Sequence, residues 1–212
     1  MNIEVVSFYS DIDGTTYYSD HAKRLKNQLD QLDISNDIRE KPSLGSYQHN
    51  CHSKPQFIYD MLKEKEQPII WLDVDSSVLK PLDIFQPMKY NTDIAVACSV
   101  PEKFESAKAS PIYFGFNDRV MKFLSNWIRL VDNSAWFDHE PLLYLLDRIC
   151  NYSDGNGFKL KFIGPNYCVW PGNENKDTII LMGLADTESK KQRLRELGHS
   201  EEIISWQSPG TK

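Results

Sequence analysis

The sequence predicts an α/β fold with a mixed, mostly parallel central sheet flanked by helices. Short apolar runs typical of strands alternate along the chain with longer segments whose apolar residues recur at helical spacing. Residues 68–73, PIIWLD, form an apolar run that ends in an aspartate, the pattern of a strand buried on both faces. The 212 residues contain no internal repeat and no low-complexity linker. We therefore expect a single domain over residues 1–212, with a peripheral tail from about residue 199.

The same patterns place the elements of the first half of the chain. We expect strands at residues 3–7, 34–38 and 68–73, a helix at 18–32, and a second helix from Pro55 to about residue 65. The first helix carries its apolar face on Ala22, Leu25, Leu29 and Leu32. Proline suits the first turn of a helix, where its missing N–H leaves no bond unmade. Residues 45–52, before that proline, are expected to form a loop.

The second half of the chain continues the alternation. We expect strands at residues 93–98, 112–116, 159–162 and 178–182, a turn at 153–157, and helices at about 140–148 and 187–197, the last ending at Gly198. Asn117 can cap a further helix, whose buried stripe comprises Val120, Phe123, Leu124, Trp127 and Val131. Residues 101–110 are polar and lie between two expected strands, so we predict that they form a mobile lid.

Composition limits the possible classes of protein. Hydrophobic residues make up 41% of the chain, which is enough for a core, and no window approaches the 18 apolar residues of a transmembrane helix. The N-terminal residues lack the basic and apolar regions of a signal peptide. The four cysteines are scattered without zinc-type spacing. We therefore expect a cytoplasmic protein, and the net charge of −6 gives no overall attraction to nucleic acid.

The residues with the clearest chemical potential follow the buried strand at 68–73. In an extended segment, Asp73 and Asp75 would point the same way while Val74 points into the core. The carboxyl end of a central strand is where open α/β sheets bind ligands. Two carboxylates about 4 Å apart repel each other by roughly 4 kcal/mol, and a divalent cation would reverse that effect. Oxygen ligands suit Mg²⁺ or Mn²⁺; the alternative is that both acids only open a surface loop.

The stretch from Lys54 to Phe85, KPQFIYDMLKEKEQPIIWLDVDSSVLKPLDIF, resembles the core of the nucleotide-diphospho-sugar transferases of the GT-A fold and Asp-x-Asp type. A weaker similarity to these glycosyltransferases extends over about residues 3–197. The resemblance implies a single Rossmann-like GT-A domain that moves a hexosyl or pentosyl group from a nucleotide-diphosphate sugar to an acceptor hydroxyl. The acceptor is left open between a glycan, a small molecule, a protein and modified DNA.

The resemblance also implies roles for individual residues. It places a Mn²⁺ or Mg²⁺ ion at Asp73 and Asp75, with Asp75 as the direct ligand. It assigns the donor-binding site to Phe8, Tyr9, Asp11, Lys54, Trp71, Asp73 and Asp75. It assigns catalysis, as a general base or a partner of a sugar hydroxyl, to Asp138 and Glu140. The residues alone also allow a solvated Lys54 at a helix start and an Asp138 that merely caps a helix.

One stretch departs from the family pattern. Many members place a metal-binding histidine near the end of the last strand, where this chain reads IILMG over residues 179–183. The third metal ligand is therefore open, and metal binding could rest on Asp75, the diphosphate and water. Lys190 and Lys191 are a possible alternative source of positive charge. A module that binds the sugar nucleotide without catalysis is a further alternative.

A second motif indicates a different chemistry. Residues 11–15, DIDGT, resemble the nucleophile signature of haloacid-dehalogenase-type Mg²⁺-dependent phosphohydrolases, in which Asp11 would attack a phosphoryl group and Asp13 would act as acid and base. Residues 7–10, SFYS, are too polar for the strand that this motif normally follows, and this interpretation leaves residues 71–75 unexplained.

A third group of residues has a weaker claim to function. His49, Cys51 and His52 could suggest a metal site, but three donors within four loop residues rarely converge on one ion. We therefore expect them to have a structural role or a role on the acceptor side.

Overall fold

The computed structural model describes residues 3–11, 15–45, 47–132, 137–152, 157–185 and 195. The helix expected at 187–197 with its end at Gly198, most of the turn at 153–157, Asp13, the pair Lys190 and Lys191, and the tail from residue 199 lie outside the described residues, apart from the single position 195.

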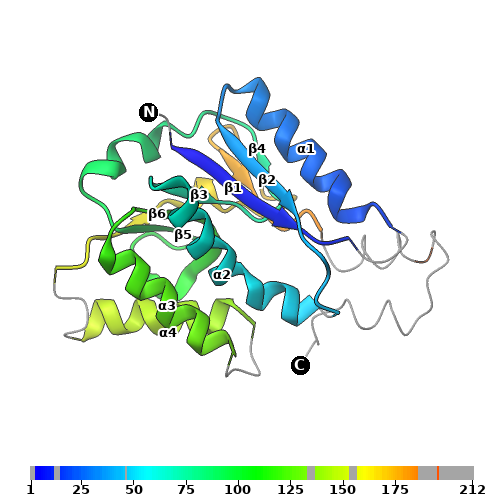
Figure 1. Ribbon diagram of the computed structural model, residues 1–212. Helices are drawn as coiled ribbons and strands as arrows, with labels where there is room; N and C mark the ends of the chain where they lie inside the picture. The colour runs from blue at the N-terminus through cyan, green and yellow to red at the C-terminus, as the bar shows by residue number, and fades with distance from the viewer. Residues whose placement is uncertain are drawn as a thin grey trace.

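A six-stranded sheet lies at the centre of the fold. Its strands, in the order β2-β1-β3-β6-β5-β7, are β2 (Asn36–Glu40), β1 (Glu4–Tyr9), β3 (Ile69–Trp71), β6 (Ala107–Phe114), β5 (Ile94–Cys98) and β7 (Leu160–Ile163) (Figure 1). Strand β6 runs antiparallel to its neighbours β3 and β5, and the other neighbouring pairs are parallel. The predicted mixed, mostly parallel sheet is thereby confirmed.

Two hydrophobic cores cover the two faces of this sheet. One core packs helices α2 (Tyr47–Lys65), α3 (Asp118–Asp132) and α4 (His139–Asn151) on one face. The other face carries α1 (Tyr17–Gln31), a 3-10 segment (Asp83–Tyr90) and a small sheet of β4 (Ser77–Val78) and β8 (Ile180–Leu181). Side chains of β3 alternate between the cores, with Ile69 and Trp71 in the first and Ile70 in the second.

The predicted apolar stripes position these helices. Residues Ala22, Leu25 and Leu29 of α1 are buried, while Leu32 packs partly buried beside them. All five predicted residues of the α3 stripe are buried. The Asn117 side-chain oxygen accepts a hydrogen bond from the Val120 N–H at 3.1 Å, so the predicted cap is present.

The expected loop at residues 45–52 was wrong. Helix α2 begins at Tyr47 and contains Pro55 in its interior. A proline inside a helix removes one backbone hydrogen bond, and the local signal therefore favoured a helix start at this position. Pro55 is buried together with Phe57 and Ile58, so packing against the sheet offsets the lost bond. Strand β2 likewise lies about two residues later than predicted.

The expected lid at residues 101–110 was wrong over its last four residues, which belong to β6. Ala107 pairs with Cys98 of β5, and both Ala107 and Ser110 are fully buried. The small side chains of Ala107 and Ser110 fit a crowded sheet interior. The strand expected at 178–182 is β8, which pairs with β4 outside the main sheet.

Two further features follow from the described residues. No helix among them is long and apolar enough to cross a membrane. None of the four cysteines, which all lie among these residues, is part of a disulfide.

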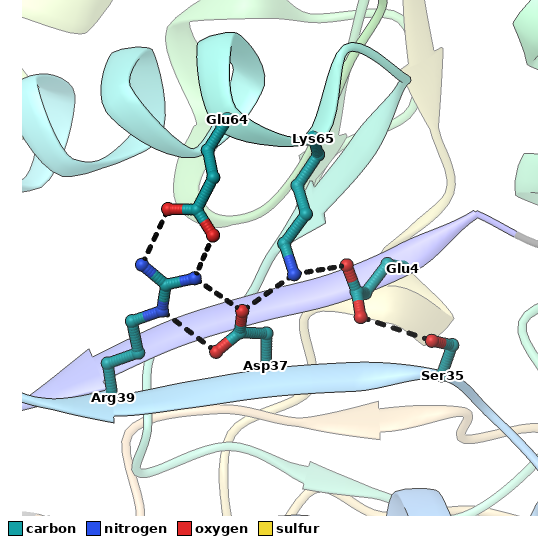
Figure 2. Close-up of polar contacts among 6 residues, drawn as sticks. All are labelled: Glu4, Ser35, Asp37, Arg39, Glu64 and Lys65. Carbon is teal, nitrogen blue, oxygen red and sulfur yellow. Dashed lines mark hydrogen bonds and ion pairs between the residues drawn. The ribbon is translucent and has the colours of Figure 1, made fainter.

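An ionic network at the β2 edge joins α2 to the sheet (Figure 2). The Arg39 guanidinium donates to Asp37 Oδ2 at 2.7 Å and to Glu64 Oε2 at 2.8 Å. The Lys65 ammonium lies 2.7 Å from Asp37 Oδ2 and 3.0 Å from Glu4 Oε2. Hydrogen bonds from Arg39, opposed by burial and assisted by Lys65, lower the pKa of Asp37 to about 2. The network therefore connects the edge strand β2 and its neighbour β1 to the end of α2.

Replacing Arg39 by Met should lower the free energy of unfolding by about 1 kcal/mol at neutral pH, because the network is partly exposed. A carboxyl group with a depressed pKa stabilises the fold above its unfolded-state pKa, and this contribution is lost as the pH falls through its folded-state pKa. The difference in the free energy of unfolding between Arg39→Met and the native protein should therefore become smaller as the pH falls from about 4 to about 2. Urea unfolding across this range tests it, with the exposed Lys23→Met as control; a difference independent of pH would contradict the assignment.

Candidate functional site

A pocket of about 230 Å³ opens at the carboxyl ends of β1 and β3. The chain places β2 on one side of β1 and β3 on the other, so this is the point at which the strand order changes direction. Open α/β sheets bind ligands at such a point. The following predicted residues line the pocket: Phe8, Tyr9, Asp11, Lys54, Trp71, Asp73, Asp75 and Asp138. Glu140 is exposed in the first turn of α4 and does not line it.

A tight turn, rather than an extended strand, presents the two carboxylates. The Ser76 N–H donates to the Asp73 carbonyl at 2.9 Å, so the chain reverses direction immediately after β3. The Asp73 N–H donates to Ser110 Oγ at 2.8 Å, which ties this turn to β6. Asp73 and Asp75 both line the pocket, and Val74 between them is buried. The strand alternation used to predict this geometry was therefore the wrong reason for a shared orientation.

A buried lysine connects three elements of the pocket. The Lys54 ammonium of α2 lies 2.9 Å from Asp73 Oδ1 and 2.6 Å from Asp138 Oδ2. Lys54 is 6% exposed and Asp138 is 5% exposed. Asp138 precedes α4 but makes no side-chain capping bond. The two simpler interpretations, a solvated Lys54 and an Asp138 that caps α4, are therefore wrong.

Trp71 completes this arrangement. Its indole N–H donates to Asp73 Oδ1 at 3.0 Å, the same oxygen that Lys54 contacts. Its ring lies 5.6 Å from the Lys54 ammonium, within the range of a cation–π contact. The Phe8 ring packs against the same indole, with its centroid 5.5 Å from that of Trp71. Trp71 thus contacts both Lys54 and Asp73, and Phe8 supports the Trp71 ring.

The electrostatics of the pocket leave negative charge in excess. Burial raises the pKa of Asp73 to about 6, with Lys54 opposing the rise and Asp75 and Asp138 adding to it. Burial also raises the pKa of Asp75, opposed by the Ala185 N–H. Burial alone would lower the pKa of Lys54, but Asp138 and Asp73 raise it above its usual value. The Lys54 ammonium, with the Arg24 guanidinium acting on Asp75, therefore faces three carboxylates in surroundings that disfavour charge.

These donors fit a hard divalent cation. Oxygen ligands in an anionic, partly desolvated pocket are what Mg²⁺ and Mn²⁺ prefer. The two side-chain contacts of Asp73 given above, with Trp71 and Lys54, both involve its Oδ1. No ion pair among the described residues involves Asp75. Within this part of the chain, no group of three His, Cys, Asp or Glu side chains is arranged to hold a metal ion.

The segment after β8 reaches Asp75 through its main chain. The Leu184 N–H donates to the Asp75 carbonyl at 3.1 Å, and the Ala185 N–H donates to Asp75 Oδ2 at 3.3 Å. Gly183 has a φ of +71°, and a Cβ at this position would lie 2.2 Å from the Trp170 ring. Glycine is therefore required where the chain passes under Trp170 to reach Asp75. This is the stretch in which the sequence departed from the family pattern.

Asp11 has a clear local role at the pocket wall. Its Oδ1 accepts hydrogen bonds from the Tyr18 N–H at 2.7 Å and the Ser19 N–H at 2.9 Å, so it caps the start of α1. Asp13, the second acid of the phosphohydrolase motif, lies outside the described residues. An Asp11 engaged in this way does not favour the phosphohydrolase alternative.

Several pocket residues were not among those predicted to bind the donor. Asn50 and Cys51 line the pocket from the first turns of α2, and Tyr18 lines it from α1. Asn50 and Cys51 stand four and three residues before Lys54, which puts them on one helical face. This spacing could have revealed them if the helix had been extended past Pro55. His49 and His52 are not among the lining residues.

Comparisons with known proteins place the fold among solved structures. A scan against models of protein families finds no match, and a search of curated proteins finds no relative. The structure is similar to the crystal structure of a glycosyltransferase involved in the glycosylation of the major capsid of PBCV-1, with a TM-score of 0.67 and 12% sequence identity. The similarity covers 93% of this chain and 99% of that chain. At this level of identity the comparison establishes a shared fold.

Replacing Lys54 by Met should lower the free energy of unfolding by about 3 kcal/mol at pH 7, because two buried carboxylates lose their partner. The deficit should shrink as the pH falls below about 6, the pKa to which burial raises Asp73, since protonation of Asp73 removes its unpaired charge. Lys63→Met, at an exposed position on the same helix, is the matched control and should change stability by no more than about 0.5 kcal/mol. Equal urea midpoints for the two variants would contradict the bridging role of Lys54.

Proposed function

We propose that this chain is a glycosyltransferase of the GT-A, Asp-x-Asp type, which moves a sugar from a nucleotide-diphosphate sugar to an acceptor hydroxyl. The observation that carries the proposal is the Asp73–Asp75 carboxylate pair in a pocket at the strand ends, with Lys54 buried between Asp73 and Asp138. The shared fold with a solved glycosyltransferase supports it, as does the resemblance of residues 54–85 to the family.

The nucleoside of the donor is proposed to lie against the β1 side of the pocket. Phe8 and Tyr9 end β1 and line the pocket. The Phe8 ring is held by Phe57 and Trp71, at centroid distances of 5.1 and 5.5 Å. A ring fixed in this way offers a preorganised apolar surface for a base or ribose, so little side-chain freedom is lost on binding.

The diphosphate is proposed to lie over the turn that carries the two aspartates. Asp75, with Asp73, would hold Mn²⁺ or Mg²⁺, and phosphate oxygens and water would supply the remaining ligands. When bound, the ion would neutralise negative charge that develops on the departing nucleoside diphosphate. Lys54 holds Asp73 Oδ1 in place, and the main chain of residues 184–185 does the same for Asp75.

Asp138 is proposed to act on the sugar or the acceptor. It lines the same pocket as Asp73 and is held there by Lys54 at 2.6 Å. From this position its carboxylate would accept a hydrogen bond from a sugar hydroxyl or take the proton of the acceptor hydroxyl. Glu140, the second acid of this pair, is exposed and outside the pocket walls, so we assign the role to Asp138.

Replacing Asp75 by Asn should reduce sugar transfer by about 100-fold or more, because the substitution removes the charge that binds the metal. Asp73→Asn should have a smaller effect, since Lys54 already contacts that carboxylate. The measurement is release of nucleoside diphosphate from a panel of nucleotide sugars in the presence of Mn²⁺. Asp83→Asn, an exposed residue outside the pocket, is the matched control and should keep full activity.

Full activity in Asp75→Asn would contradict the metal assignment. Release of phosphate from small phosphoesters that is lost in Asp11→Asn would replace the proposal with the phosphohydrolase alternative. Donor binding without turnover on any acceptor would indicate a module that only binds the sugar nucleotide.

A further inference from the structure

The charged side chains of the pocket at the strand ends are mostly of one sign. Four aspartates line this pocket, and Lys54 is the one basic residue among the described residues that do so. The aspartates are Asp11, Asp73, Asp75 and Asp138. Four negative charges against one positive charge leave a net charge of −3 on the lining. A ligand group that is itself negative is therefore disfavoured in this pocket.

The positive charge of Lys54 is already engaged by the protein. Its ammonium lies 2.9 Å from Asp73 Oδ1 and 2.6 Å from Asp138 Oδ2, and the Trp71 ring lies 5.6 Å from the same nitrogen. An ammonium group has only three N–H donors, and the Lys54 side chain is 6% exposed. Lys54 therefore has little capacity left to pair with a carboxylate of a ligand.

Two further cations lie near the pocket without lining it. The Arg24 guanidinium donates to the Ser76 carbonyl at 3.2 Å, in the turn that follows Asp75. The Lys41 ammonium lies 5.1 Å from the centroid of the Phe8 ring, on the side of the pocket proposed to hold the nucleoside. Neither residue is among those that a ligand in the pocket would contact.

The hydrogen-bonding groups of the lining suit hydroxyl groups. Ser43 and Asn50 line the pocket together, and Asn50 Nδ2 donates to Ser43 Oγ at 3.3 Å. The carboxylate of Asp138 can only accept hydrogen bonds. A sugar hydroxyl can donate to it, whereas an ionised carboxylate on the sugar has no proton to donate. The lining is therefore complementary to a sugar that carries hydroxyl groups and no negative charge.

We propose that the donor sugar is uncharged, and that Asp138, held by Lys54, excludes sugars that carry a carboxylate, such as uronic acids. This inference rests on the proposed glycosyl transfer, since it concerns the sugar of the same donor. A divalent cation at Asp75 would offset part of the negative charge, and the diphosphate of the donor would restore it. The sugar would lie between that diphosphate and Asp138, so a carboxylate on it would meet negative charge on both sides.

The probes for this proposal are the glucose, glucuronate and xylose derivatives of one nucleoside diphosphate, the one that the native protein binds most tightly with Mn²⁺. At C6 of the sugar, glucose carries an alcohol, glucuronate carries a carboxylate of similar size, and xylose carries no group. Calorimetric titration of the full chain with Mn²⁺ should show that the glucuronate derivative binds about tenfold or more weakly than the glucose derivative. The xylose derivative should bind more tightly than the glucuronate derivative, because it adds no charge.

A variant tests the role of Asp138 in this selection. Asp138→Asn removes one negative charge and leaves an amide that can donate, so the ratio of the two affinities, glucose derivative to glucuronate derivative, should fall by about threefold or more. Asp83→Asn removes one negative charge at an exposed position outside the pocket and should keep the native ratio. The titrations of the native protein do not depend on the folding of either variant.

The outcomes separate this inference from the proposed function. Equal affinity of the native protein for the glucose and glucuronate derivatives, or tighter binding of the glucuronate derivative, would overturn the inference and leave the proposed function standing. Binding of the xylose derivative as weak as that of the glucuronate derivative, or an unchanged ratio in Asp138→Asn, would do the same. Failure of every nucleoside diphosphate to bind would contradict the proposed function, and the inference with it.

Discussion

The buried ammonium of Lys54 is the constraint around which the rest of the site is arranged. A charge with 6% exposure is tolerated only when paired, and its partners come from the turn after β3 and from the residue before α4. Because α2 begins at Tyr47 and not at Pro55, Lys54 lies inside the helix, which fixes the backbone from which its side chain reaches both partners. Trp71, at the end of β3, donates its indole N–H to the same Asp73 oxygen that Lys54 contacts.

The two neighbouring aspartates, Asp73 and Asp75, are held by different kinds of group. Asp73 is tied to a lysine and an indole, whereas Asp75 is tied to main-chain N–H groups of a segment more than one hundred residues later. Main-chain donors stabilise a carboxylate without bringing a full positive charge beside it. Asp75 is therefore the acid that we propose as the direct ligand of the cation, while Lys54 and Trp71 hold Asp73 in place. Gly183 is part of this arrangement because only a residue without Cβ fits beneath Trp170.

The sequence was sufficient for the residues whose position depends on a strand end. Phe8, Tyr9, Asp73 and Asp75 line one pocket at the carboxyl ends of β1 and β3. Apolar strand patterns locate such strand ends well. It was insufficient where packing overrode a local signal. Pro55 indicated a helix start, whereas α2 begins at Tyr47. Asn50 and Cys51 were therefore not placed at the donor pocket. The pairing of Lys54 with Asp138, 84 residues away, leaves no local pattern in either segment.

Calorimetric titration of nucleoside diphosphates into the native protein and Asp75→Asn, with Mn²⁺ or with EDTA, tests the central claim most directly. The account predicts that at least one nucleoside diphosphate binds the native protein at least tenfold more tightly with Mn²⁺, a gain of about 1.4 kcal/mol. It also predicts that Asp75→Asn loses this gain and keeps the affinity seen with EDTA. A metal-dependent gain of equal size in both proteins, or no binding of any nucleoside diphosphate, would contradict a donor site built on Asp75.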